Sequence, residues 1–327
     1  MMGHGHSSFN LAVGLSVGDA LTLSPSATIA LGLASAGAGL LPDIDCAGST
    51  AATAFGPFSS IAHHAAIQLH HVVSASITTD QHEHSAHRGL THWWPFWVVC
   101  GAAVWAGCQA SLWTATAVLA LLFALAARGL TIPDLPAETQ GRFDDSLRHQ
   151  TMMRLAYGLL NLNPFTFVLR RMRKHVAKSR RYGWRWLGFR FGTGKVFTAA
   201  AAAVLAYLLM TTGVVAILAP WLGLIIGLGM ALHYLGDCPT HMGVPGIKLH
   251  QIWKLPFWAS FYAGGPFEIM VIWFSLGWLN IVLTPGLLTH AHQMVVLLWA
   301  GLGLGGFIAL AVVIEATSTV KRRRYAT

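Results

Sequence analysis

The stretch APWLGLIIGLGMALHYLGD, residues 219–237, is apolar along most of its length and ends on the ionisable residues His233 and Asp237. It is nearly as long as the roughly 20 residues that an α-helix needs to cross a bilayer. Ionisable groups at the edge of hydrocarbon are costly unless they are paired, hydrated or bound to metal. The stretch therefore predicts a membrane helix that carries functional residues at its end.

The composition of the whole chain also indicates a membrane protein. Of 327 residues, 54% are hydrophobic and only 10% are charged, and the mean hydropathy is +0.56. Ordinary soluble domains carry far more charge. We therefore expect an integral membrane protein. The four cysteines give no disulfide framework.

Other apolar segments pair along the chain into hairpins. The last four segments are long enough, or nearly so, to span a bilayer, whereas the first four are short enough to be tilted, re-entrant or packed inside a bundle. Breakers at Ser24-Pro25, Gly107-Cys108-Gln109, Ala219-Pro220 and Pro285-Gly286 separate the members of each pair. The sequence predicts one integral membrane domain over residues 1–327, an all-α polytopic bundle of helical hairpins with about 6–8 membrane segments. The candidates are 8–21 and 25–41, 93–107 and 111–128, 196–216 and 219–237, and 267–284 and 291–316.

Basic residues indicate the orientation in the membrane. Ten of the 21 Lys and Arg residues lie between Arg170 and Lys195, and four more form Lys321-Arg322-Arg323-Arg324. By the positive-inside rule, both clusters belong on the cytoplasmic side. We therefore expect cytoplasmic termini and a cytoplasmic basic, amphipathic insertion at about residues 129–195.

The insertion also interleaves aromatic residues with cations, a composition that suits nucleic acid as well as lipid. A basic, Trp-rich stretch just before a membrane helix is more simply an anchor on anionic lipid headgroups. We expect membrane lipids and a small amphipathic substrate as partners and do not expect nucleic acid. The residues do not identify a protein partner.

Three short clusters of ionisable residues lie at the ends of apolar segments, where paired hairpins would bring them to one face. They are Leu-Leu-Pro-Asp-Ile-Asp at 40–45, His-Arg-Gly-Leu-Thr-His at 87–92, and residues 233–243. His233 and Asp237 are four apart, so on a helix they project from one face. Asp43 and Asp45 are two apart and should point differently. We expect one to bind metal and the other to act as a base, a bridge or a partner of a ligand.

The candidate ligand set combines imidazoles with carboxylates. Such a set suits Zn²⁺, which we favour, or Mn²⁺ or Fe²⁺, better than Ca²⁺. It exceeds one tetrahedral coordination sphere, so one or two ions could bind. The candidate metal ligands are His6, Asp43, His87, His92, His233 and Asp237.

Other residues of the clusters have expected roles in catalysis or in support of the ligands. Asp43 and Asp45 are the candidate catalytic carboxylates, and Arg88 suits a bidentate clamp on a phosphate or carboxylate oxygen. Thr91, Thr240 and Cys46 are candidates for contacts to ligands or substrate.

Simpler structural interpretations exist for some of these residues. Asp43 and Asp45 could simply cap or solvate a helix end. His63, His64, His70 and His71, which recur at a spacing of seven on an amphipathic segment, are expected to be interfacial.

These motifs resemble those of the YdjM family of inner-membrane proteins, for which metal-dependent hydrolase activity is predicted. The resemblance rests on Gly5-His6, on residues 40–45 and 87–92, and on His233, Asp237, Thr240 and Gly243-Val-Pro, in that order. It implies a bacterial cytoplasmic (inner) membrane protein with a His/Asp metal site. The chain departs from the family pattern at Cys46, where His is usual, and at Trp93, where Ser is usual.

Three functional classes follow from these observations. The leading hypothesis is a membrane-embedded metal-dependent hydrolase with its site at the cytoplasmic face, acting on a lipid, a lipid-linked phosphate or another amphipathic ester. The second is a metal-ion transporter or sensor, although a transporter more usually holds its ligands near the bilayer midplane. The third is a non-catalytic membrane scaffold with a structural metal site.

Overall fold

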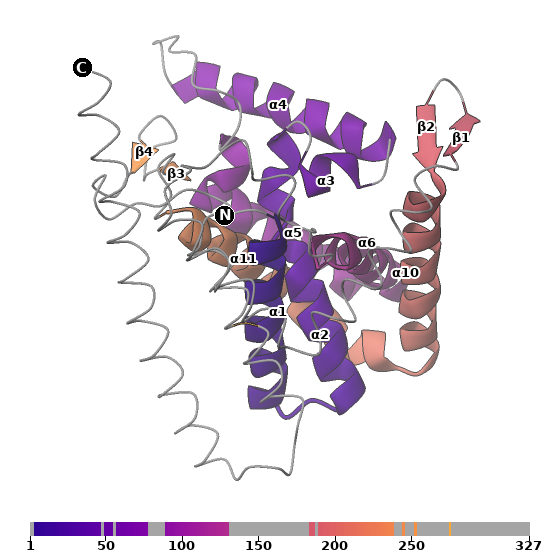
Figure 1. Ribbon diagram of the computed structural model, residues 1–327. Coiled ribbons are helices and arrows are strands. Elements are labelled where there is room, and N and C mark those ends of the chain that lie inside the picture. Colours follow the sequence, from indigo (N-terminus) through magenta and orange to yellow (C-terminus); the bar gives the residue numbers. More distant parts are fainter. Residues whose placement is uncertain are drawn as a thin grey trace, which may run out of the picture.

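The structure is a computed structural model of the 327-residue chain. It describes residues 3–46, 49–54, 57–77, 89–130, 183–186, 189–238, 244–245, 252–253 and 275. These residues form a helical bundle with two short pairs of antiparallel strands, which confirms the all-α prediction (Figure 1).

The first hairpin consists of α1 (Gly3–Ala20) and α2 (Pro25–Ala38), followed by the short 3-10 helix η1 (Leu41–Asp45). The Ser24 side chain accepts a hydrogen bond from the Ala27 backbone N–H, and Pro25 occupies the first turn of α2. Both features start helices, because the side chain satisfies an orphan N–H and Pro needs no donor there. The turn predicted at Ser24-Pro25 is therefore confirmed.

The second hairpin is formed by α5 (Trp94–Ala110) and α6 (Leu112–Gly129). The 3-10 helix η2 (Leu90–His92) precedes it. A single residue, Ser111, separates the two helices, and its side chain accepts a hydrogen bond from the Thr114 N–H. The break predicted at Gly107-Cys108-Gln109 is wrong by a few residues, since α5 continues through it to Ala110.

The third hairpin is formed by α10 (Thr193–Thr211) and α11 (Val214–Asp237). We predicted its turn at Ala219-Pro220, and this is wrong. The chain reverses at Thr212-Gly213, where Gly213 has a φ of 77°, a conformation that favours glycine. Pro220 lies inside α11. A proline there removes one backbone hydrogen bond, which a packed membrane helix tolerates.

Helix length and hydropathy identify three candidate membrane spans in the described part of the chain: residues 25–45, 112–129 and 214–237. The helix segment Val196–Thr211 is apolar but shorter. The expected total of about 6–8 membrane segments stays a prediction. The segments 267–284 and 291–316 lie outside the described residues.

The core lies among α2, α6 and α11, with α5 and α10 packed around them. Its largest fully buried side chains include Leu31, Leu119, Leu122, Leu218 and Leu222. Apolar residues such as Val98 on α5 and Phe197 on α10 are exposed. Apolar surface on outer helices is the pattern expected where lipid is the solvent.

Shorter elements complete the described fold. Two helices, α3 (Thr50–Thr53) and α4 (Pro57–Ile77), pack against each other and against η1 at one end of the bundle (Figure 1). In the basic region, β1 (Gly183–Trp186) pairs with β2 (Phe189–Gly192), a hairpin that we did not predict. After α11, β3 (Val244–Pro245) pairs with β4 (Ile252–Trp253). The single-domain prediction and the amphipathic insertion remain predictions.

Candidate metal centre

The structure brings residues from four parts of the chain to one end of the bundle. His6 lies in the first turns of α1, Asp43 in η1 after α2, and His92 in η2 before α5. His233 and Asp237 lie in the last two turns of α11. Because the hairpins are antiparallel, a helix that begins at this end lies beside helices that finish there. The topology thus unites polar residues up to 231 positions apart, counted from His6 to Asp237.

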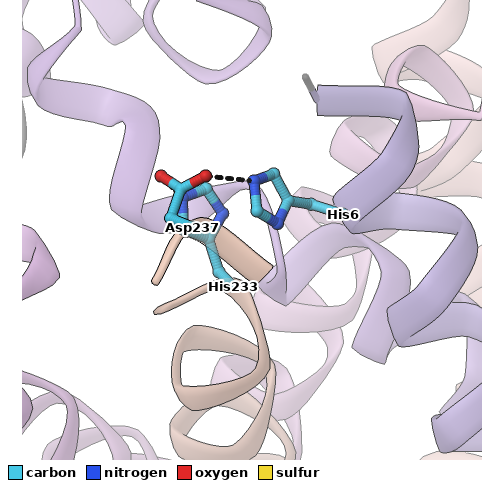
Figure 2. A group of neighbouring side chains, drawn as sticks. All are labelled: His6, His233 and Asp237. Atoms are coloured by element: carbon cyan, nitrogen blue, oxygen red, sulfur yellow. Dashed lines mark ion pairs between the residues drawn. The ribbon is translucent and has the colours of Figure 1, made fainter. Parts of the chain in front are cut away.

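One group of possible metal ligands contains His6, His233 and Asp237, with one ligand atom from each within 4.8 Å of the others. His6 Nε2 lies 3.3 Å from Asp237 Oδ1, and His233 Nε2 lies 3.6 Å from Asp237 Oδ2. Figure 2 shows the His6 ring facing the other two side chains. The rings of His6 and His233 are stacked, with centroids 3.6 Å apart. All three residues are buried.

A second group shares His233 and adds Asp43 and His92. His233 Nε2 lies 3.1 Å from His92 Nε2 and 3.5 Å from Asp43 Oδ1. The side chain of Asp43 is 15% exposed, whereas those of both histidines are fully buried. Asp43 is therefore the member of the group with some access to solvent.

The backbone determines which ring nitrogen of His233 faces the group. His233 Nδ1 lies 2.6 Å from the Gly39 carbonyl oxygen. A carbonyl only accepts hydrogen bonds, so Nδ1 carries the proton and donates. In the neutral imidazole, the other nitrogen, Nε2, then presents its lone pair to His92 and to the carboxylates. This is the arrangement by which metal-binding histidines are usually held.

His92 is oriented in the same way by side chains. Thr91 Oγ1 donates a 2.5 Å hydrogen bond to Asp45 Oδ2, so its oxygen can only accept from His92 Nδ1, 3.3 Å away. That assignment puts the proton on His92 Nδ1 and the lone pair on Nε2. Burial inside the bundle lowers the pKa of the His92 imidazole, which favours this neutral form.

With both imidazoles neutral, two lone pairs and two carboxylates converge at this end of the bundle. His92 Nε2 and His233 Nε2 are only 3.1 Å apart, and Asp237 Oδ2 lies within 3.9 Å of both. Such acceptors repel one another unless a proton or a metal ion lies among them. The residues therefore fit a divalent transition metal by both ligand chemistry and charge.

Asp43 and Asp45 point to different places, as their spacing predicts. Asp43 faces the Nε2 atoms of both histidines. Asp45 is 4% exposed and lies on the other side of His92, where its Oδ2 accepts hydrogen bonds from Thr91 Oγ1 and from the Gly89 N–H at 3.3 Å. Neither residue serves only as a helix cap.

Not every predicted site residue can be placed. His87, Arg88 and Thr240 lie outside the described residues. Cys46 directly follows η1 and is partly buried, but neither group of possible ligands includes it. Their expected roles stay predictions.

Some contacts at the site were not anticipated. The contact of His233 with the Gly39 carbonyl could not be predicted from the sequence, because every residue has a backbone carbonyl. His63 and His70 were expected to be interfacial only, yet His63 Nδ1 lies 2.7 Å from the Ile44 oxygen and His70 Nδ1 accepts a hydrogen bond from the Leu90 N–H. Their seven-residue spacing was the available signal, since it puts both on one face of a helix.

Comparison with known proteins agrees with the sequence motifs over the first part of the chain. Residues 1–131 match the family model described as YdjM inner membrane protein. The match confirms the resemblance for α1 to α6, including His6, Asp43 and His92, whereas His233 and Asp237 lie beyond it. No curated protein and no solved structure matches the chain.

Proposed function

On the premise that residues 1–131 match a family of inner membrane proteins, we propose that the chain is a membrane-embedded, metal-dependent hydrolase. The observation that carries the proposal is the convergence of His92 Nε2, His233 Nε2 and the Asp43 and Asp237 carboxylates at one end of the bundle. We propose that this end faces the cytoplasm. Zn²⁺ is the favoured ion, and Mn²⁺ or Fe²⁺ would also suit these ligands.

The geometry of Asp237 supports a capacity for either one or two ions. Its Oδ1 faces His6, whereas its Oδ2 faces both His92 and His233. A single imidazole nitrogen does not bridge two ions, so His233 would serve one of them. If two ions bind, the residues that would hold them are His6, Asp43, His92, His233 and Asp237.

Each residue of the site has its own proposed role in hydrolysis. A bound divalent ion would supply Lewis-acid polarisation of an ester or phosphoester oxygen. Asp43, the partly exposed carboxylate, is placed to take and return a proton at its Oδ atoms. Asp45 acts through Thr91 to hold the His92 ring in one tautomer. Arg88, four residues before His92, would contact an anionic substrate oxygen.

The position of the site supports an amphipathic substrate. Asp43 and Asp237 lie at the ends of two candidate membrane spans, residues 25–45 and 214–237. A lipid, a lipid-linked phosphate or a similar ester would present its polar bond at that depth. The same position argues against a transporter, whose ligands are more usually found near the midplane.

Purified protein, stripped of metal and reloaded with Zn²⁺, Mn²⁺ or Fe²⁺, provides the test. Phosphoester, carboxylic ester and amide substrates with long acyl chains would be compared with their short-chain analogues. We expect metal-dependent hydrolysis of a long-chain ester or phosphoester and a loss of about 10²–10⁴-fold in Asp43→Asn. The matched control is Asp19→Asn, which makes the same change at an exposed carboxylate on α1. A metal-loaded protein that hydrolyses no substrate class would favour the transporter or scaffold instead.

A further inference from the structure

Helix α4 lies across the end of the bundle that holds the candidate metal centre (Figure 1). Among the described elements, it packs against η1, which carries Asp43, and against η2, which carries His92. These two turns are far apart in sequence, and both must be placed correctly for Asp43 and His92 to approach His233.

Two histidines of α4 bind the backbones of these two turns. His63 and His70 are seven residues apart, so they lie on one face, two turns or roughly 10.5 Å apart along the axis. His63 Nδ1 lies 2.7 Å from the Ile44 carbonyl oxygen of η1. His70 Nδ1 accepts a 3.1 Å hydrogen bond from the Leu90 N–H of η2. Each imidazole therefore contacts a residue adjacent to, or two positions from, a candidate ligand.

We propose that α4 is a rigid strut that sets the spacing between η1 and η2, and that His63 and His70 are its positioning residues. The inference rests on the proposed metal centre and deepens it, because it assigns a role to two histidines that do not belong to either ligand group. The fixed length of a helix makes it suited to holding two turns at a constant separation.

The hydrogen bonds require opposite tautomers at the same ring atom. The Ile44 carbonyl only accepts, so His63 Nδ1 carries a proton, whereas the Leu90 N–H donates, so His70 Nδ1 does not. An asparagine amide can place either a donor or an acceptor near the position of Nδ1. Leucine has a similar size and offers neither, so the two substitutions separate hydrogen bonding from packing.

The opposite face of α4 shows why these polar contacts matter. Ile61 is 68% exposed and Val72 is 66% exposed, so this face contributes little buried apolar surface. Leu90 is buried, and its N–H would lack the His70 acceptor if that side chain changed. No side chain among residues 61–73 of α4 is fully buried, so the hydrogen bonds of His63 and His70 contribute to orienting the helix on the site.

The test measures Zn²⁺ affinity and amide hydrogen exchange in the full-length protein. We expect His63→Leu and His70→Leu to weaken Zn²⁺ binding about tenfold or more, the usual effect of losing a residue that supports ligands. His63→Asn and His70→Asn should restore most of the affinity. In His70→Leu, exchange in residues 89–93 should also accelerate. His71→Leu, an exposed neighbour, is the matched control and should match the wild type in both measurements.

The two readouts separate this inference from the proposed function. If the wild type binds Zn²⁺ and both leucine variants bind it equally well, the strut is refuted and the metal centre stands. If the wild type binds no metal, the metal centre fails, and unchanged exchange of residues 89–93 in His70→Leu would refute the strut as well. Should His70→Leu fail to fold, His63→Leu carries the test, and Zn²⁺ binding by His63→Leu as tight as that of the wild type would contradict the strut.

Discussion

Asp237 makes more contacts within the candidate centre than any other described carboxylate. Its two oxygens lie within 3.9 Å of ring nitrogens of His6, His92 and His233. A neutral amide keeps the shape but offers one weak acceptor in place of a charged, bidentate ligand. We therefore expect Asp237→Asn to lose most of its bound metal.

Metal content per chain, measured by elemental analysis after purification without chelators, checks this expectation. Asp19→Asn makes the same chemical change at an exposed residue of α1 and should keep the metal of the wild type. Equal metal content in Asp237→Asn and in the wild type would mean that this carboxylate is not a ligand.

Thr91 links the carboxylate of Asp45 to the ring of His92. Its hydroxyl donates to an Asp45 side chain that is only 4% exposed. Thr91→Val keeps the shape but removes the donor, so it should reduce the free energy of unfolding by about 1.5–3 kcal/mol. Chemical denaturation in detergent measures the change. Thr91→Ser keeps the hydroxyl and should lie much closer to the wild type, and equal stability of all three proteins would refute the link.

At the scale of the element, α11 must approach α2 closely for His233 to reach the Gly39 carbonyl. A Cβ added at Gly229 would lie 2.6 Å from the Ala38 Cβ and 3.1 Å from the Gly39 nitrogen. Gly229→Ala should therefore push the helices apart and weaken metal binding by about tenfold, as other losses of ligand support do.

Gly227 provides the matched control on the same helix. A Cβ at this position would come no closer than 3.8 Å to the nearest neighbour, the Trp97 oxygen, which is ordinary contact. Gly227→Ala should bind metal as the wild type does in a titration of the purified protein. If both variants bind metal equally well, the close approach at Gly229 does not control the site.

Sequence predicted those features of the site that depend on local periodicity. The spacing of His233 and Asp237 puts both on one face of α11, and the pairing of apolar segments brings their helix end beside His6, Asp43 and His92. Predictions from such spacings stay correct even where the predicted helix boundaries are wrong by a few residues. The spacing of two between Asp43 and Asp45 likewise predicted their different directions.

Other features depend on contacts that no local pattern encodes. The Gly39 carbonyl that holds His233 is 194 positions away in the chain and belongs to the backbone. The roles of His63 and His70 depend on α4 crossing the end of the bundle. Pro220 predicts a break from its local cost to a helix, but packing inside the bundle offsets that cost and α11 continues through it.

At the scale of the whole molecule, the basic residues predict the orientation in the membrane. The basic clusters at 170–195 and 321–324 predict that the N-terminus, the 129–195 insertion and the C-terminus are all cytoplasmic. Single cysteines introduced near Gly141 and Thr327 should be labelled from the cytoplasmic side only. Labelling of these two positions from opposite sides would refute an even number of spans.

The central claim is that imidazoles and carboxylates from α1, η1, η2 and α11 enclose a divalent metal ion. X-ray absorption spectroscopy of the purified, metal-loaded protein tests it most directly. We predict a shell of nitrogen and oxygen ligands at about 2.0–2.2 Å with an imidazole signature and no sulfur. The absence of bound metal would contradict the claim, as would a sulfur shell at about 2.3 Å, which would transfer the site to cysteines such as Cys46 or Cys238.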